Sequence, residues 1–213
     1  MQSTIKVMIV DDHSIFREGV KQIVSDTRDI AVVSEAESGR TAIQLCRQHD
    51  CDVLLLDISL PDRSGLEVLK QVKKESPKVA VLMLSMHRED LYAVRSIKSG
   101  AAGYLNKQSA PGELVNAIRL VSGGKRYISP VLAQELASHV SEERPAMPHE
   151  ALSDREYQTL TMIASGKTVT GIADELALSV KTVSMYRTRL LSKMKLKHNA
   201  ELTHYAIKNQ LVD

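Results

Sequence analysis

Five short aliphatic runs recur along the N-terminal part of the chain, and amphipathic stretches separate them. The runs are IKVMIV (5–10), AVVSEA (31–36), VLLLD (53–57), VAVLMLS (79–85) and GYLNK (103–107). Between two of them, Leu66, Leu69 and Val72 repeat with a helical period. This alternation predicts an α/β fold, a doubly wound five-stranded parallel sheet with helices on both faces. In such sheets, functional side chains gather at the carboxyl ends of the strands.

The pattern changes after Gly123-Gly124, which predicts a helix stop. Ser129-Pro130 predicts an N-cap followed by a proline in the first helical turn, opening a helix that runs through Val140. The charged segment SEERPAMPHE (141–150) has two prolines and no apolar period, so we expect a linker there. The predicted parts are a first domain at 1–124, an interdomain helix and linker at 125–151, and a second domain at 152–213.

The second domain is predicted to be all-α. Ser153 and Glu156 form a capping-box pattern ahead of an apolar-periodic stretch, and Gly166 is expected to end that helix. We expect further helices at 169–176 and at 180–195, the second with Ser179 as its cap, and a last helix that Asn199 caps. Four short helices with tight turns predict a helix-turn-helix domain.

Composition excludes several classes of protein. With 43% hydrophobic and 25% charged residues among 213, the chain is an ordinary globular one. Its formal net charge of +2 is too small to indicate nucleic acid, but residues 181–197 hold six Lys or Arg and no acid. Cys46 and Cys51 do not suggest a disulfide scaffold, so reduced, buried thiols are expected. No signal peptide or long apolar run is visible, which predicts a cytoplasmic protein without a membrane partner.

Three acids stand where strands are expected to end. Asp11 and Asp12 directly follow the first run, and Asp57 closes the third. Because the ends of neighbouring parallel strands converge, three carboxylates would crowd one pocket, which is costly without a cation. Mg²⁺ prefers oxygen ligands and fits two carboxylates plus a carbonyl. The sequence therefore predicts a magnesium site.

Two further polar residues end the remaining strands, Ser85 the fourth and Lys107 the fifth. An ammonium and a hydroxyl beside a carboxylate and Mg²⁺ form a site for a phosphoryl group, with a carboxylate as the nucleophile. Each residue alone is weak evidence, since an acid pair after a strand is a common turn feature. The joint occurrence of all five at successive strand ends is what predicts function.

These residues resemble the receiver domain of response regulators, a CheY-like, flavodoxin-like fold. The resemblance covers residues 5–122 and rests on VDDH (10–13), LLDISLPDRSGLE (55–67), LMLS (82–85) and AAGYLNKQS (101–109). It implies that Asp57 is the phosphoacceptor and that Asp12 and Asp57 bind Mg²⁺ directly. By the same resemblance, Asp11 acts mainly through water and the backbone carbonyl of Ser59 completes the ligands.

The resemblance also assigns roles around the phosphoryl group. Ser85 and Lys107 would contact it, and Tyr104 would be an aromatic switch that turns inward when Ser85 moves. The alternative for Tyr104 is a half-exposed strand residue without a function. Ser59 and His87 occupy positions that tune dephosphorylation in the family.

The stretch 180–195 has two faces. Val180, Val183, Leu190, Leu191 and Met194 share an apolar side, whereas Lys181, Met185, Thr188 and Ser192 lie opposite. The second face could enter a major groove, with Arg189 and Lys193 beside it to reach phosphates. Arg187 lies nearer the apolar side. A solvated basic surface is the alternative reading.

Residues 152–197 resemble the LuxR-type helix-turn-helix of the NarL/FixJ family, most specifically at IADELALSVKTVS. The resemblance implies that Lys181 and Thr182 contact phosphates and that Ser184, Met185 and Thr188 face bases. Tyr186 stands where the family usually has His, and Gly171 where a polar helix former is usual.

The predicted function is a response regulator that accepts a phosphoryl group from a sensor histidine kinase and binds double-stranded promoter DNA to regulate transcription. It is not predicted to be an enzyme. RNA polymerase is a further expected partner, and phosphorylation is expected to favour a homodimer. The last helix, through Leu202, Tyr205 and Ala206, is the expected contact between DNA-binding domains.

Two alternatives remain open on the sequence. One is an aspartyl-phosphate hydrolase of the haloacid dehalogenase kind, although its D-x-D pattern on the first strand is missing. The other is a phospho-dependent protein-interaction module that has lost DNA binding.

Overall fold

The computed structural model describes residues 4–48, 50–86, 91–129, 132–134, 147–209 and 211–212. The chain divides into two units, Met1–Ser138 and His139–Asp213. Ser129 accepts a hydrogen bond from the Leu132 amide, as an N-cap does. Residues 135–146, where the rest of the interdomain helix and most of the linker were expected, lie outside the described residues, so the three predicted domain boundaries stay predictions.

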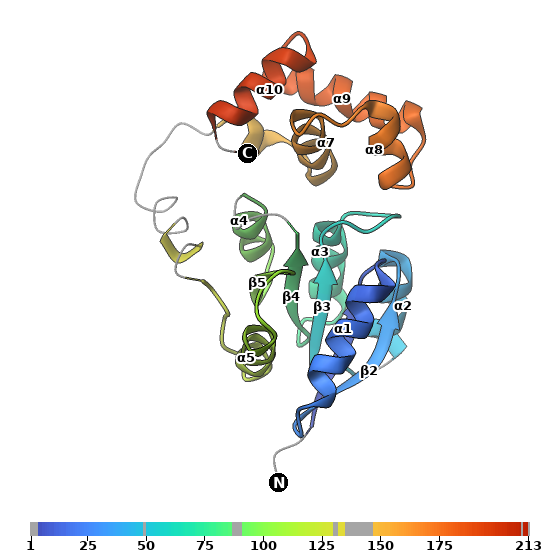
Figure 1. Cartoon of the computed structure of the whole chain (residues 1–213), viewed down its shortest axis with the longest axis vertical. Helices are drawn as coiled ribbons and strands as arrows, with labels where there is room; N and C mark the ends of the chain where they lie inside the picture. Colours follow the sequence, from blue (N-terminus) through green and yellow to red (C-terminus); the bar gives the residue numbers. More distant parts are fainter. Residues whose placement is uncertain are drawn as a thin grey trace. The chain divides into compact units, whose positions relative to one another are not determined.

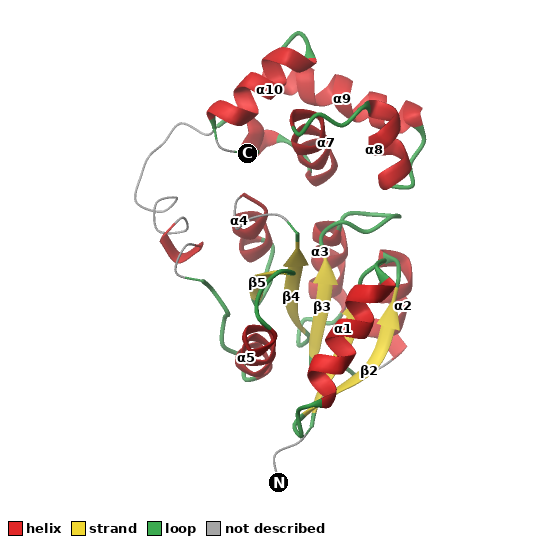
Figure 2. Cartoon of the chain, in the orientation of Figure 1, coloured by secondary structure: helices red, strands yellow, loops and turns green. Residues whose placement is uncertain are grey.

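The first unit is a parallel sheet with the strand order β2-β1-β3-β4-β5 (Figures 1 and 2). The strands are β1 (Ile5–Val10), β2 (Ile30–Ala36), β3 (Val53–Asp57), β4 (Ala80–Ser85) and β5 (Gly103–Asn106). The helices between and after them are α1 (Ser14–Ser25), α2 (Gly39–Gln48), α3 (Gly65–Glu75), α4 (Leu91–Lys98) and α5 (Pro111–Ser122). The predicted doubly wound α/β fold is confirmed, with strand ends within two residues of the predicted ones.

Alternate strand residues pack on opposite faces of the sheet, because side chains alternate along a strand. Val7, Ile9 and Leu55 pack with the buried faces of α1 and α5, which cover one side. The residues between them, such as Met8 and Leu54, are equally buried on the other side, where α2, α3 and α4 lie against the sheet. Burial on both faces explains why the strands read as continuous aliphatic runs rather than alternating ones.

The loop from β3 to α3 lies tightly against the end of β3. A Cβ atom at Gly65 would come within 2.0 Å of the Asp57 carbonyl oxygen, so only glycine permits this approach. Ser64 caps α3 by accepting a hydrogen bond from the Leu66 amide. Asp62 accepts hydrogen bonds from the first amides of α2, those of Gly39 and Arg40. The loop after Asp57 is therefore fixed at several points.

The second unit is helical, as predicted. It comprises a short 3-10 turn, η1 (Pro148–Ala151), and the helices α7 (Asp154–Ala164), α8 (Val169–Glu175), α9 (Val180–Met194) and α10 (Asn199–Lys208). The capping box of Ser153 and Glu156 is present, and Ser179 caps α9. One cap was predicted wrongly: His198, not Asn199, occupies the N-cap of α10, and its ring Nδ1 accepts a hydrogen bond from the Glu201 amide. An imidazole nitrogen can replace the usual oxygen acceptor at this position.

None of the helices within the described ranges is long and apolar enough to cross a membrane.

Candidate functional site

Three predicted site residues meet at the carboxyl ends of the strands. Asp11 follows β1, Asp57 ends β3 and Lys107 follows β5. The Lys107 ammonium lies 2.7 Å from Asp11 Oδ2 and 2.9 Å from Asp57 Oδ2, and all three side chains are at most 4% exposed. The Lys107 Nζ atom also stands 4.9 Å from the centre of the Phe16 ring, a cation–π arrangement that covers it from one side.

Asp12 and His13 lie at the exposed edge of this group of acids. One side-chain ligand atom from each of Asp11, Asp12, His13 and Asp57 falls within a group no more than 4.8 Å across. The Asp12 side chain is 32% exposed and that of His13 65%, so solvent reaches the acid group from this edge. His13 Nδ1 lies 3.1 Å from Asp11 Oδ1 and 2.9 Å from Asp12 Oδ1. His13 had no predicted part in the site, although it directly follows the acid pair in the sequence.

The acid group fits a hard divalent cation. Apart from Lys107, no donor in the described part of the chain reaches the buried Oδ2 atoms of Asp11 and Asp57. Buried carboxylate oxygens with so few donors are the ligands that Mg²⁺ takes. Asp12 adds a third carboxylate on the accessible edge. The residues present therefore suit the metal that the sequence predicted.

Burial and charge perturb the two central groups in a coupled way. Burial raises the pKa of the Asp57 carboxyl, and the nearby Asp11 adds to the rise, while Lys107 and the Ser59 backbone amide oppose it. Burial alone would lower the pKa of the Lys107 ammonium, but Asp57 and Asp11 together raise it. The ammonium is therefore held in its charged form beside a carboxylate that is costly to ionise.

Ser85 and Tyr104 lie on one face of the sheet. In the register of β4 and β5, Met83 pairs with Tyr104 and Ser85 with Asn106, so Ser85 and Tyr104 are diagonal neighbours on the same side. Both are fully buried, at 1% and 0% exposure, which overturns the alternative of a half-exposed Tyr104. Ser59 is half-buried, two residues beyond Asp57. His87 lies outside the described residues.

The recognition helix expected at 180–195 is α9. Val183, Leu190, Leu191 and Met194 are buried, as predicted, but Val180 is 47% exposed and does not belong to that apolar face. Val180 is the first residue of the helix, and the buried residues of α9 begin one turn later at Val183. On the opposite side, the exposed residues include Lys181, Ser184, Met185, Thr188, Arg189, Ser192 and Lys193, with Thr182 half-buried.

Two cations of α9 have partners within their own unit. Lys193 Nζ lies 2.6 Å from Oε2 of the buried Glu156, and Arg187 Nε donates to Asn199 Oδ1 at 2.6 Å. Arg187, whose target the sequence left unclear, therefore ties α9 to α10. Lys193 ties α9 to the start of α7, which the expected phosphate contact did not anticipate.

The proposed contact surface on α10 needs correction. Leu202 and Ala206 are fully buried, and the Tyr205 hydroxyl lies 2.7 Å from His149 Nδ1. Leu202 and Ala206 therefore pack within the unit, where α10 lies against α7, and do not form a contact surface; Tyr205 is half-buried, and a contact through α10 stays a prediction. The exposed side of α10 carries Ala200, His204, Ile207 and Lys208.

Family models match both units of the chain. The response regulator receiver domain matches residues 7–119, and the bacterial regulatory proteins of the luxR family match residues 150–206. The chain belongs to the NarL/FixJ family of response regulators. The hydrolase alternative does not agree with this membership.

Named relatives span the whole regulator. The response regulator UvrY of Escherichia coli (strain K12) is 41% identical over 208 residues, covering 97% of this chain and 95% of UvrY. The response regulator GacA of Pseudomonas aeruginosa is 37% identical over 210 residues and covers 98% of each chain.

Solved structures agree with this family. A LuxR-family response regulator from Aurantimonas sp. SI85-9A1 has a TM-score of 0.61 at 36% identity, over 66% of this regulator and 100% of that chain. RcsB from Salmonella enterica serovar Typhimurium, bound to promoter rprA with the phosphomimetic BeF3-, has a TM-score of 0.66 at 25% identity, over 95% and 98% of the chains.

The raised pKa of Asp57 predicts that Asp57→Asn stabilises the metal-free regulator. A carboxyl with a higher pKa in the folded chain than in the unfolded chain destabilises the fold once it ionises. This penalty is absent below the unfolded-chain pKa of about 3.9 and is complete above the raised folded-state pKa. In urea unfolding measured in EDTA, Asp57→Asn should increase the free energy of unfolding, and this increase should grow from acidic to neutral pH.

Asp62→Asn is the matched control, because the pKa of Asp62 is lowered and its loss should change the free energy of unfolding in the opposite direction. Although partial burial works against it, the amides of Gly39 and Arg40 lower the pKa of Asp62. That carboxylate therefore stabilises the fold above its unfolded pKa, and its loss should destabilise the protein at neutral pH. An Asp57→Asn variant less stable than the parent at every pH would contradict the assignment of burial as the dominant effect.

Proposed function

We propose that phosphorylation of Asp57 controls promoter binding by this regulator. The observation that supports the proposal is the contact of one buried ammonium, that of Lys107, with two carboxylates at the strand ends. A buried cation placed there can neutralise the charge of an added phosphoryl group. The phosphoryl donor is proposed to be a sensor histidine kinase. We propose that the protein has no enzymatic activity toward other substrates and acts in the cytoplasm.

Asp12 and Asp57 are proposed to bind Mg²⁺ directly, with the Ser59 carbonyl, while Asp11 acts through water. The acid group and its scarcity of donors support this set. When bound, Mg²⁺ would neutralise phosphoryl oxygens during transfer.

The chain's own residues then account for the transfer. An Asp57 carboxylate oxygen forms a bond to phosphorus, and the bond from phosphorus to the donor nitrogen breaks with its electron pair leaving on the nitrogen. Lys107 and the Ser85 hydroxyl contact the new phosphoryl oxygens. Tyr104, on the same face of the sheet as Ser85, is proposed to follow the movement of Ser85 and alter the surface near α4.

Acetyl phosphate tests the phosphoacceptor. With Mg²⁺ it should add one phosphoryl group, detected as a mass increase, and Asp57→Asn should abolish the addition.

Asp12→Ala should raise the Mg²⁺ concentration that labelling requires, because it removes a direct ligand. Lys107→Ala should reduce DNA-binding activation even where labelling survives. Unchanged labelling of Asp57→Asn would show that another residue is the acceptor.

The second unit is proposed to bind double-stranded promoter DNA with α9 in the major groove. Lys181 and Thr182 are proposed to contact phosphates, as are Arg189 and Lys193 at the edge of the groove. The exposed Ser184, Met185 and Thr188 are proposed to face bases, supported by their shared outer side of the helix. The RcsB relative bound to its promoter DNA favours this role over the protein-interaction alternative. RNA polymerase is proposed as a further partner at the promoter.

Lys181 and Thr188 should respond differently to substitution. Lys181→Ala should weaken binding to operator and scrambled DNA alike and reduce the salt slope by about one unit, because it removes a phosphate contact. Thr188→Ala should change sequence preference by about 1 kcal/mol at one base pair. Titrations at several salt concentrations measure both. A Lys181→Ala variant that loses only operator affinity would place the helix differently, and absence of any salt-dependent binding would favour the protein-interaction module.

A homodimer is proposed to form on phosphorylated protein, with DNA-binding units meeting through the exposed side of α10. Ile207 is 55% exposed there, between His204 and Lys208, where an apolar side chain gains from a partner surface. Two linked copies would read two half-sites and gain affinity from each other.

Ile207→Glu should therefore weaken binding to a two-half-site operator by about 100-fold while leaving single half-site binding unchanged. Gel-shift titrations on the two DNAs measure this difference. Ile15→Glu is the matched control, because it places the same change at an isoleucine that is 87% exposed on α1. Equal effects of both substitutions would contradict the proposed surface.

A further inference from the structure

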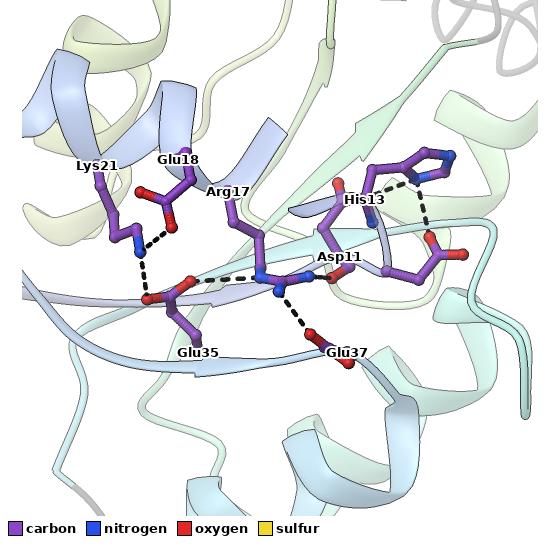
Figure 3. A network of polar contacts seen from close by, with 8 residues as sticks. Asp11, His13, Arg17, Glu18, Lys21, Glu35 and Glu37 are labelled. Carbon is purple, nitrogen blue, oxygen red and sulfur yellow. Dashed lines mark hydrogen bonds and ion pairs between the residues drawn. The ribbon is translucent and has the colours of Figure 1, made fainter. Parts of the chain in front are cut away.

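A buried arginine stands behind the acid pair. Arg17 projects from α1, and Figure 3 shows its guanidinium between the end of β1 and the end of β2. Its Nη1 donates to the Asp11 carbonyl oxygen at 2.7 Å. Its Nε contacts Glu35 Oε2 at 3.3 Å, and its Nη2 donates to Glu37 Oε1 at 2.6 Å. One side chain thus joins three segments of the chain.

Asp11 is held from both sides of its peptide unit. Its own amide donates to the Ala36 carbonyl at 3.1 Å, and its carbonyl receives the Arg17 hydrogen bond. Its Oδ1 atom also accepts a hydrogen bond from the His13 amide. The backbone that carries Asp11 and Asp12 is therefore anchored to β2 and α1, which sets the direction of both carboxylates.

The positive charge of Arg17 is already balanced. Glu35 and Glu37 contact the guanidinium, whereas Arg17 reaches Asp11 at its carbonyl and not at its carboxylate. The Arg17 side chain is 10% exposed, and burying an arginine is favourable only when its donors are satisfied. Geometry, more than charge, is what this residue adds to the acid pair.

We propose that Arg17 is a positioning residue that holds the Asp11–Asp12 backbone in the conformation that binds Mg²⁺. This inference rests on the proposed magnesium site. A residue behind a metal ligand commonly contributes a factor of about 10–100 to metal affinity by orienting it. Lys21 belongs to the same network, since its ammonium lies 2.9 Å from Glu35 Oε1 and 2.5 Å from Glu18 Oε1 (Figure 3). Lys21 makes no contact with Asp11, which makes it the matched control.

Calorimetric titration of the full chain with Mg²⁺ alone tests the proposal. Arg17→Gln should raise the dissociation constant at least about tenfold. Arg17→Lys should give a smaller rise, because an ammonium keeps one contact but cannot span three partners. Lys21→Ala should leave the dissociation constant unchanged. Acetyl phosphate labelling of Arg17→Gln should be slow at limiting Mg²⁺ and recover at high Mg²⁺, a rescue that a purely structural role would not give.

The possible results distinguish a failure of the positioning role of Arg17 from a failure of the proposed magnesium site. An unchanged Mg²⁺ dissociation constant in Arg17→Gln, together with weakened binding in Asp12→Ala, would overturn the positioning role alone. A lower Mg²⁺ dissociation constant in Arg17→Gln would also overturn the positioning role, because Arg17 would then act as a cation that competes with Mg²⁺. Unaltered binding in Asp12→Ala would overturn the magnesium site and the inference with it. If Arg17→Gln does not fold, Arg17→Lys and Lys21→Ala carry the comparison.

Discussion

The ion pairs of Lys107 with Asp11 and Asp57 are the interaction on which the receiver site depends. Asp11 follows β1, Asp57 ends β3 and Lys107 follows β5, and β4 separates β3 from β5. Adjacent strands lie about 4.8 Å apart, so only a long side chain from β5 reaches the carboxylates. Without the ammonium, two buried carboxylates would face each other with few donors, which is among the costliest arrangements in a protein interior. The strand order therefore requires a long cationic side chain such as lysine at the end of β5.

The same packing makes the site suitable for a switch. Asp57 lies at a strand end that packs closely against Gly65 and the capped start of α3, so the backbone around it is held in place. Ser85 and Tyr104 are both buried on one face of the sheet, where they are diagonal neighbours. In the proposed switch, a change at Asp57 would pass through this face to the side of the sheet that carries α4, since close-packed interiors shift between discrete arrangements rather than deform smoothly.

The DNA-binding unit divides its cations between structure and recognition. Arg187 and Lys193 join α9 to α10 and α7, while Lys181 and Arg189 have no acidic partner within the described residues. These two contacts tie α9 to two other helices of the unit. In the proposed complex with DNA, Lys181 and Arg189 would reach phosphates without giving up an ion pair, whereas Lys193 would exchange its contact with Glu156 for a phosphate.

Sequence alone determined the doubly wound sheet, the strand-end acids with Lys107 and Ser85, and the four C-terminal helices. Periodicity and turn residues are local signals, so they predict helices and strands directly. A parallel sheet brings the carboxyl ends of its strands to one edge, whatever the path of the connecting loops. Side-chain partners were decided only by the tertiary structure. Arg17 and Lys193 look like surface cations in the sequence, Leu202 and Ala206 like a contact surface, and Val180 like core. Each depends on which distant segment covers it, such as β2 over Arg17 or α7 over α10, and a helical period records one buried side without naming what buries it.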